Sequence, residues 1–274
     1  MNTSISSAQN PRIKDLLALQ EKSRLRKERG LFVVEGIREI RHCIEGGYII
    51  KEIFHNPSMI SEEKLLQMFP AGAGDVTIAS VNDYVYEKIG YRGSTEGAIA
   101  IVEARELSLN GLNCICDGKR SPFIIVTEEV EKPGNIGALL RTADACGADA
   151  VIICNPLTDI YNPNIIRSSL GGLFTNRIAV CSSTDAIQWL KSKGISIYTA
   201  QLQNSVPYYS ADFTAPSAIV LGSEAKGLSP EWREASDRKI IIPMLGRIDS
   251  LNVSISAAVL CYEVVRQRIT GNTL

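Results

Sequence analysis

Short apolar runs alternate with amphipathic stretches along most of the chain, and this alternation predicts a fold of strands and helices. The runs at residues 219–221 and 240–242 are short and β-branched, which is typical of strands buried on both faces. From Pro122 onward the alternation is regular and predicts an α/β domain, with a mostly parallel sheet covered by helices. Strands are expected at residues 123–127, 150–154, 178–181, 195–199, 218–221 and 239–242, and helices at residues 136–146, 164–174, 184–193, 229–235 and from 250 or 251 to 268.

The first hundred residues show the same alternation in shorter segments and predict a separate, small α/β domain. The regular pattern is lost after residue 104, where Asn110-Gly111 and Asp117-Gly118 are turn signals. We therefore divide the chain into a domain at residues 1–104, a linker at 105–121 and a second domain at 122–274. Strands of the first domain are expected at residues 31–34, 48–55, 76–80 and 98–102.

The composition is that of an ordinary globular protein, with 45% hydrophobic and 22% charged residues among 274. The sequence has no apolar run of the ~18–20 residues that a membrane-spanning helix needs, and its N-terminus lacks the apolar core of a secretory signal. Seven cysteines without a C-x-x-C pair favour buried, reduced thiols over a metal site. We therefore expect a cytoplasmic protein with no membrane and no metal.

A basic segment stands out against a net charge of only −1. Residues 10–29 hold seven basic side chains against three acidic ones. Charge alone favours a solvated helix face with ion pairs between neighbouring turns, while contact with a nucleic-acid backbone is the alternative. The basic side chains considered for such contact are Arg12, Lys14, Arg24, Arg26 and Lys27.

Two glycine-containing loops follow the last two predicted strands, at residues 222–227 and 243–249. Ligands bind outside the carboxyl ends of strands in an open parallel sheet, so these loops are the first candidate site. The loops match neither the Walker pattern nor G-x-G-x-x-G, which argues against a nucleotide or dinucleotide site. After the first strand of this domain, Arg141 lies in the following helix and offers a fork of donors suited to a phosphate, although a surface ion pair is an equal alternative.

Three segments of the second domain together resemble a known family. Asn135–Thr142 (NIGALLRT), Leu221–Leu228 (LGSEAKGL) and Ile242–Ser254 (IPMLGRIDSLNVS) are similar, in order and spacing, to the three motifs of the SpoU/TrmH branch of the SPOUT RNA methyltransferases. The segments NPRIK at residues 10–14 and FVVEG at residues 32–36 resemble the L30e-like, α/β substrate-binding domain of the same family.

The resemblance implies a deep C-terminal trefoil knot, a homodimer formed through the knotted domain, and S-adenosyl-L-methionine as cofactor. In this family the adenosine is held by backbone groups of the two glycine-containing loops. Apolar side chains at two of these positions suit the faces of a purine. The implied cofactor-binding residues are Gly222, Ile242, Leu251, Thr199, Ala200, Gly227 and Met244.

The implied reaction is methyl transfer to a ribose 2′-hydroxyl of RNA. Arg141 matches the family's catalytic arginine, but a guanidinium with a pKa above about 12 is a poor base. We therefore assign Arg141 to grip the adjacent phosphate and to stabilise the developing alkoxide, while a phosphate oxygen or water accepts the proton. Asn135, Glu224, Ser250 and Asn252 complete the implied catalytic set.

Ribosomal RNA is the expected substrate, and transfer RNA is the alternative. Two further hypotheses compete: an RNA-binding member of the fold that has lost catalysis, and methylation of a base. The presence of Asn135, Arg141, Glu224 and Asn252 argues against the first. For the basic segment at residues 10–29, charge alone favours a solvated helix face. The resemblance to an RNA-modifying family instead favours contact with RNA.

Overall fold

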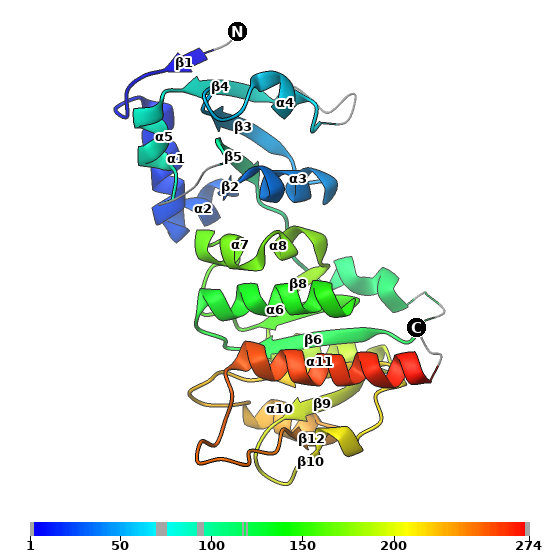
Figure 1. The fold of residues 1–274 in the computed structure, drawn as a ribbon. Helices are drawn as coiled ribbons and strands as arrows, with labels where there is room; N and C mark the ends of the chain where they lie inside the picture. The colour runs from blue at the N-terminus through cyan, green and yellow to red at the C-terminus, as the bar shows by residue number, and fades with distance from the viewer. Residues whose placement is uncertain (1–2, 70–75, 92–95, 117, 119, 272–274) are drawn as a thin grey trace. The chain divides into compact units, whose positions relative to one another are not determined.

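The computed structural model describes residues 3–69, 76–91, 96–116, 118 and 120–271 (Figure 1). The chain forms two compact units. Unit 1 contains Met1–Glu106 and Asp159–Thr175, and unit 2 contains Leu107–Thr158 and Asn176–Leu274. The division made from the sequence kept residues 159–175 with the second domain, whereas their contacts lie within unit 1.

Unit 1 is built on a mixed sheet whose described strands lie in the order β1-β4-β3-β5-β2. The pairs β1·β4 and β3·β4 are parallel, and β5 runs antiparallel to both of its neighbours. The four predicted strands are present within two residues of their expected ends, and β1 is an additional edge strand. The elements are β1 (Thr3–Ile5), α1 (Pro11–Glu21), α2 (Ser23–Arg29), β2 (Leu31–Glu35), α3 (Ile37–Glu45), β3 (Ile50–His55), α4 (Glu62–Leu66), β4 (Thr77–Val81), α5 (Asp83–Ile89) and β5 (Ala98–Glu103).

Residues Asp159–Thr175, the second segment of unit 1, are held by aromatic side chains. The rings of Phe32 and Tyr161 stack with their centroids 4.3 Å apart, and Phe174 lies edge-on to Tyr48 at 5.2 Å. This segment carries α7 (Pro163–Ser169) and α8 (Gly172–Thr175). A single helix was expected here, but Leu170 and Gly171 both adopt positive φ and end the first helix.

Unit 2 contains the parallel sheet expected from the sequence. Its described strands lie in the order β10-β12-β9-β11-β6-β7-β8, and all neighbours are parallel. Thus β11 lies between β6 and β9, and β12 lies between β9 and β10. The strands are β6 (Phe123–Glu128), β7 (Ala150–Cys154), β8 (Ile178–Cys181), β9 (Ser196–Ala200), β10 (Val206–Pro207), β11 (Ser217–Leu221) and β12 (Arg238–Ile241).

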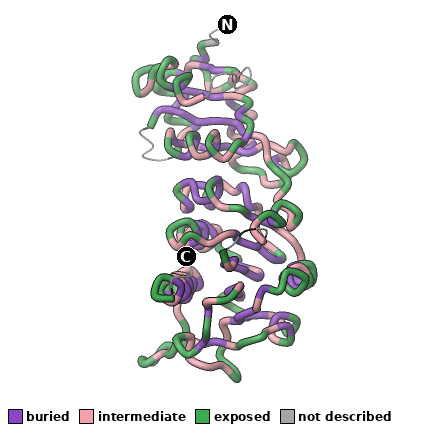
Figure 2. The backbone as a smooth tube through the Cα atoms, turned by 90° about the vertical axis from the view of Figure 1, so that its right-hand side faces the viewer, coloured by how far each residue is buried: buried purple, intermediate pink, exposed green. Residues whose placement is uncertain are grey.

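Helices cover both faces of this sheet. Helices α6 and α11, which lie side by side in Figure 1, cover one face of the sheet. Helices α9 and α10 pack on the other face, around the fully buried Trp232. Every residue of β6, β7 and β11 is buried, as expected for a sheet covered on both sides, and Figure 2 shows the backbone coloured by burial. The helices are α6 (Pro133–Cys146), α9 (Ser183–Ser192), α10 (Pro230–Ala235) and α11 (Val253–Thr270), with 3₁₀ turns at Leu109–Cys116 and Tyr208–Ser210.

The last helix begins later than expected, at Val253. Asn252 is its N-cap residue, and the Asn252 side chain accepts a hydrogen bond from the Ser254 backbone N–H at 3.0 Å. The residues before it therefore belong to the loop after β12. No helix in the described part of the chain is both long enough and apolar enough to cross a membrane.

Candidate active site

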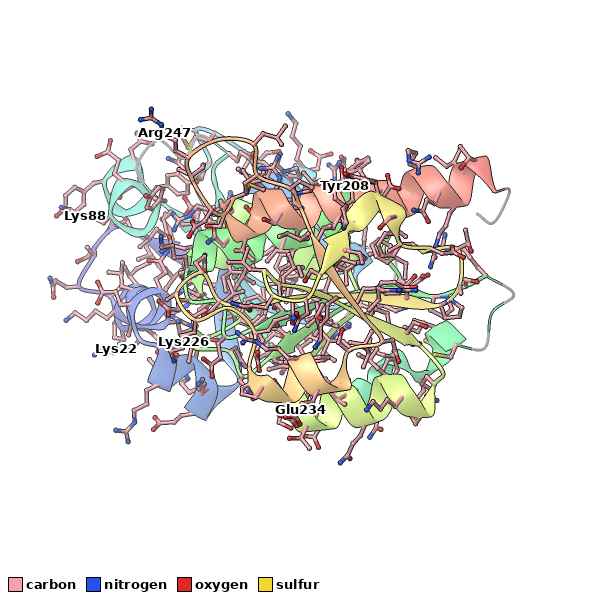
Figure 3. The ribbon with its side chains drawn as sticks, turned by 90° about the horizontal axis from the view of Figure 1, so that it is seen from below. Lys22, Lys88, Tyr208, Lys226, Glu234 and Arg247 are labelled. Carbon is pink, nitrogen blue, oxygen red and sulfur yellow. The ribbon has the colours of Figure 1, made fainter. Side chains whose placement is uncertain are left out.

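The carboxyl ends of β9, β11 and β12 surround a cavity of about 410 Å³ in unit 2. Both glycine-containing loops contribute to its wall, as the position of ligand sites in open parallel sheets leads one to expect. Figure 3 labels one exposed cation on each of these loops, Lys226 and Arg247. The predicted residues that line the cavity are Ala200, Gly222, Glu224, Gly227, Ile242, Met244, Ser250 and Leu251.

Glycine is required at position 222 because the loop folds back onto it. A Cβ atom at this position would collide with the carbonyl of Gly227 and the backbone nitrogen of Leu228. Gly227 itself adopts a φ of +68°, and its N–H donates to the Ser223 carbonyl at 2.9 Å. The loop is therefore a tight turn whose backbone can come close to a ligand.

The base of this loop is tied to the end of β6 by a buried carboxylate. Glu128 is only 3% exposed, and it accepts hydrogen bonds from the Ser229 backbone N–H at 2.8 Å and from the Ser183 hydroxyl at 2.7 Å. The Ser183 hydroxyl in turn accepts from the indole N–H of Trp232 at 2.9 Å. This network links the glycine loop to the core of unit 2.

The three motifs meet in a chain of side-chain hydrogen bonds. Asn252 Nδ2 donates to Asn135 Oδ1 at 3.1 Å, and Asn135 Nδ2 donates to Glu224 Oε1. The amide of Asn135 thus bridges a residue of the first loop and the cap of the last helix. Because Asn135 donates with its nitrogen and accepts with its oxygen, the orientation of its amide is fixed from both sides.

Four predicted residues are not among those that line the cavity: Asn135 and Asn252, which form the bridge to Glu224, and also Thr199 and Arg141. Thr199 is fully buried, and its hydroxyl is 2.7 Å from that of Ser236, so its side chain does not face the cavity. Arg141 is exposed on α6 and is not among the cavity-lining residues of the described chain. Its guanidinium is accessible to a partner that approaches from solvent.

The basic segment of unit 1 is largely engaged in ion pairs. Arg26 is 4% exposed, donates to Asp159 at 2.5 Å and also donates to the carbonyls of Leu19 and Gln20. Its guanidinium is therefore not available to RNA in this arrangement. Arg12 pairs with Glu52, and Arg24 pairs with Glu28, whereas Lys14 and Lys27 are exposed.

Sequence reasoning missed several residues around the cavity. Arg233 of α10 lines it, and the Nε atom of this side chain is buried without a hydrogen-bond partner in the described structure. The buried Glu128 was also missed, although its place at the carboxyl end of a predicted strand was a usable signal. Further residues that line the cavity include Gln201, Leu202, Gln203 and Asp249.

Comparison with known proteins identifies the family. Residues 122–262 match the SpoU rRNA Methylase family, which is more than half of the chain. The chain belongs to the SpoU rRNA methylase family. A second match covers residues 10–100, to the MRM3-like substrate binding domain.

Relatives of this SpoU-family chain extend over nearly its full length. A 23S rRNA (uridine(2479)-2′-O)-methyltransferase of Streptomyces viridochromogenes is 28% identical, over 97% of this chain and 93% of its own. A solved RNA 2′-O ribose methyltransferase is 34% identical, with a TM-score of 0.79 over 97% of this chain and 100% of the other. An AdoMet-bound rRNA methyltransferase from Sinorhizobium meliloti is 27% identical, with a TM-score of 0.85 over 96% and 97% of the two chains.

Proposed function

We propose that this chain is an S-adenosyl-L-methionine-dependent methyltransferase that modifies a ribose 2′-hydroxyl of ribosomal RNA. One observation carries the proposal: Asn135 of the first motif bridges Glu224 and Asn252 by hydrogen bonds, which joins it to the second and third motifs, and these two motifs line the cavity. The relatives named above act on 23S rRNA or on an RNA ribose 2′-oxygen, which favours ribosomal RNA over transfer RNA.

The cavity has the properties that this cofactor needs. The turn at Gly222 leaves no room for a side chain, so the loop offers backbone groups to the adenosine. Ile242, Met244 and Leu251 provide apolar wall for the purine, and the Glu224 carboxylate suits a cation. Ala200 and Gly227 complete the proposed contacts. The Thr199 side chain points away from the cavity, so only the backbone of Thr199 is available to the cofactor. When bound, the cofactor supplies an electrophilic methyl group on a sulfonium.

The protein side chains orient the ribose and manage its proton. Asn135, held by Glu224 and Asn252, keeps Glu224 in place for the ribose, and Ser250 lies on the cavity wall. Arg141, exposed on α6, holds the neighbouring phosphate of the RNA and stabilises the developing alkoxide. A phosphate oxygen or water accepts the hydroxyl proton, because the guanidinium stays protonated.

The resemblance also implies a trefoil knot and a homodimer, and the structure offers support for both proposals. The placement of β11 and β12 on either side of β9 is a strand order that suits a threaded C-terminus. On α11, Ile255, Tyr262 and Ile269 are spaced by seven residues and are 51–55% exposed. Such a stripe on one helix face suits burial against a second copy.

We further propose that residues 1–104, as an L30e-like domain, bind the RNA substrate, that residues 105–121 link the domains, and that residues 122–274 carry the chemistry. The match of residues 10–100 to a substrate binding domain supports the first part. Lys14, Arg24 and Lys27 are the basic side chains of the N-terminal segment that remain candidates for RNA contact. The cytoplasmic location stays a prediction from the sequence.

The test is transfer of a labelled methyl group from S-adenosyl-L-methionine to unmodified 23S rRNA, with transfer RNA as the competing substrate. Methylation of the 2′-oxygen makes the adjacent phosphodiester resistant to alkali, so the label is expected in an alkali-resistant dinucleotide. Label that appears in a free nucleotide would instead indicate base methylation. Cofactor binding without transfer to either RNA would favour an RNA-binding member that has lost catalysis.

A further inference from the structure

Two tyrosines on unit 1 are exposed to solvent with a cation beside each ring. Tyr84 and Tyr91 are 57% and 58% exposed. The guanidinium carbon of Arg167 lies 3.5 Å from the centre of the Tyr91 ring, and Lys88 Nζ lies 5.9 Å from that of Tyr84. Because Tyr84 and Lys88 are four residues apart on α5, they share one face of the helix.

A pocket of about 330 Å³ lies beside Tyr91. Its wall includes Tyr91 and Arg167, which form one cation–aromatic pair, and Lys88, which is the cation of the other pair. We call the four residues Tyr84, Lys88, Tyr91 and Arg167 the tyrosine platform. Figure 3 labels Lys88 at the outer side of α5, consistent with its exposure.

Polar groups surround the open part of this pocket. Glu35 accepts a hydrogen bond from the Tyr91 backbone N–H at 2.8 Å, which holds the main chain at Tyr91. Arg167 Nη2 donates to Asn164 Oδ1 at 2.9 Å, and this bond orients the guanidinium over Tyr91. Glu21 and Asn162 also line the pocket, as does Arg26, whose charge is neutralised by Asp159.

These contacts favour a nucleobase as the occupant. One face of the Tyr91 ring is covered by Arg167, yet more than half of the side chain is exposed, which leaves surface on which a base can stack. Amide and carboxylate groups beside a ring can pair with the edge of an unstacked base. A protein partner would need more apolar surface than the pocket offers, since Ile89 and Pro163 are its main aliphatic contributors.

We propose that the tyrosine platform binds single-stranded RNA: Tyr91 stacks on a base whose edge meets the polar groups of the pocket, and Lys88 contacts a phosphate. This inference rests on the proposed function, because it names the surface by which the RNA substrate is held. The RNA contact that the sequence assigned to the buried Arg26 is thereby assigned to exposed groups on the same unit.

Fluorescence anisotropy with a short, mixed-sequence single-stranded RNA tests the platform. Loss of one base–ring stack weakens binding by about tenfold, so Tyr91→Leu is expected to raise Kd by this factor without changing its salt dependence. Tyr91→Phe keeps the ring and is expected to bind like the wild type. Lys88→Gln removes a phosphate contact and is expected to reduce the slope of log K against log salt by about 0.7.

The outcomes separate this inference from the proposed function. If the wild type methylates 23S rRNA but Tyr91→Leu and Lys88→Gln bind RNA as the wild type does, the platform is wrong and the enzyme assignment stands. If the wild type transfers no methyl group to RNA, the enzyme assignment falls by itself, whatever the anisotropy shows. A change of oligomeric state in Tyr91→Leu, measured by light scattering, would show a protein interface and overturn the platform.

Discussion

Asn135 and Asn252 are 117 positions apart in the chain, and their side-chain amides are joined by a hydrogen bond of 3.1 Å. Asn135 also donates to Glu224, so it stands between two loops of the candidate site. The geometry assigns Asn135 the task of holding these loops in register. Its contribution can be measured because each partner can be altered alone.

Replacing Asn135 by alanine is expected to lower kcat/KM by roughly ten- to hundredfold, the equivalent of about 1.5–3 kcal/mol for a hydrogen bond to a charged group. Asn252→Ser removes the donor to Asn135 but keeps an oxygen able to cap α11. The double variant should lose little more than Asn135→Ala alone, since both changes break the same chain. Fully additive losses in steady-state methyl transfer would show that the two asparagines act independently.

Arg141 is expected to act on RNA and not on the cofactor, because it is exposed and lies outside the cavity. Arg141→Ala should therefore bind S-adenosyl-L-methionine like the wild type while methyl transfer falls by on the order of 10²–10³. Arg141→Lys keeps the charge without the two-pronged donor and should recover only part of the rate. Calorimetry measures cofactor affinity, and labelled methyl transfer measures the rate. Near-normal turnover in Arg141→Ala would remove Arg141 from the catalytic set.

Six of the described strands of unit 2 were predictable because each is a short apolar run, and β6, β7 and β11 are buried along their whole length. Residues 150–154 and 178–181 were expected as strands, and β7 and β8 occupy the same positions. The break at Leu170 was not predictable from periodicity, since the apolar spacing continues across it. Nor was the two-residue strand β10, which is too short to carry an alternating pattern.

The sequence predicts residues for the candidate site but not the hydrogen bonds that join them. Motif resemblance selected Asn135, Glu224 and Asn252, yet nothing in the sequence shows that Asn135 lies between the other two. Side-chain burial was the main error for charged groups: Arg26 resembled its exposed neighbours, but its partner Asp159 is 133 positions away. A pattern of charges along one helix carries no information about such a distant partner.

Gly222 should tolerate no side chain, because the loop backbone occupies the place of a Cβ. In Gly222→Ala the loop must shift, with a strain of about 1–3 kcal/mol. That shift displaces the backbone groups proposed to hold the adenosine, so cofactor affinity is expected to fall by roughly ten- to hundredfold. Gly111→Ala is the matched control, since a Cβ there meets nothing within 4 Å. Unchanged cofactor affinity in Gly222→Ala, measured by calorimetry, would place the binding site elsewhere.

Arg268 near the end of α11 is buried, at 3% exposure, and burial lowers the pKa of its guanidinium. It donates to the carbonyls of Phe213, Ser121, Pro122 and Ala215 and to the Ser217 hydroxyl, at 2.6–3.1 Å. These acceptors belong to the segments that lead into β6 and β11. One side chain thus anchors the last helix to the starts of two central strands.

Arg268→Met should destabilise unit 2 by about 3 kcal/mol or more, because it strands several buried carbonyls without a donor. Arg266→Met is the matched control on the same helix: the Arg266 side chain is 59% exposed and pairs with Glu263 three residues away, so a smaller change is expected. The only two tryptophans, Trp189 and Trp232, both lie in unit 2, so their fluorescence during urea unfolding reports on this unit. Equal urea midpoints for the two variants would show that the Arg268 contacts do not hold the last helix in place.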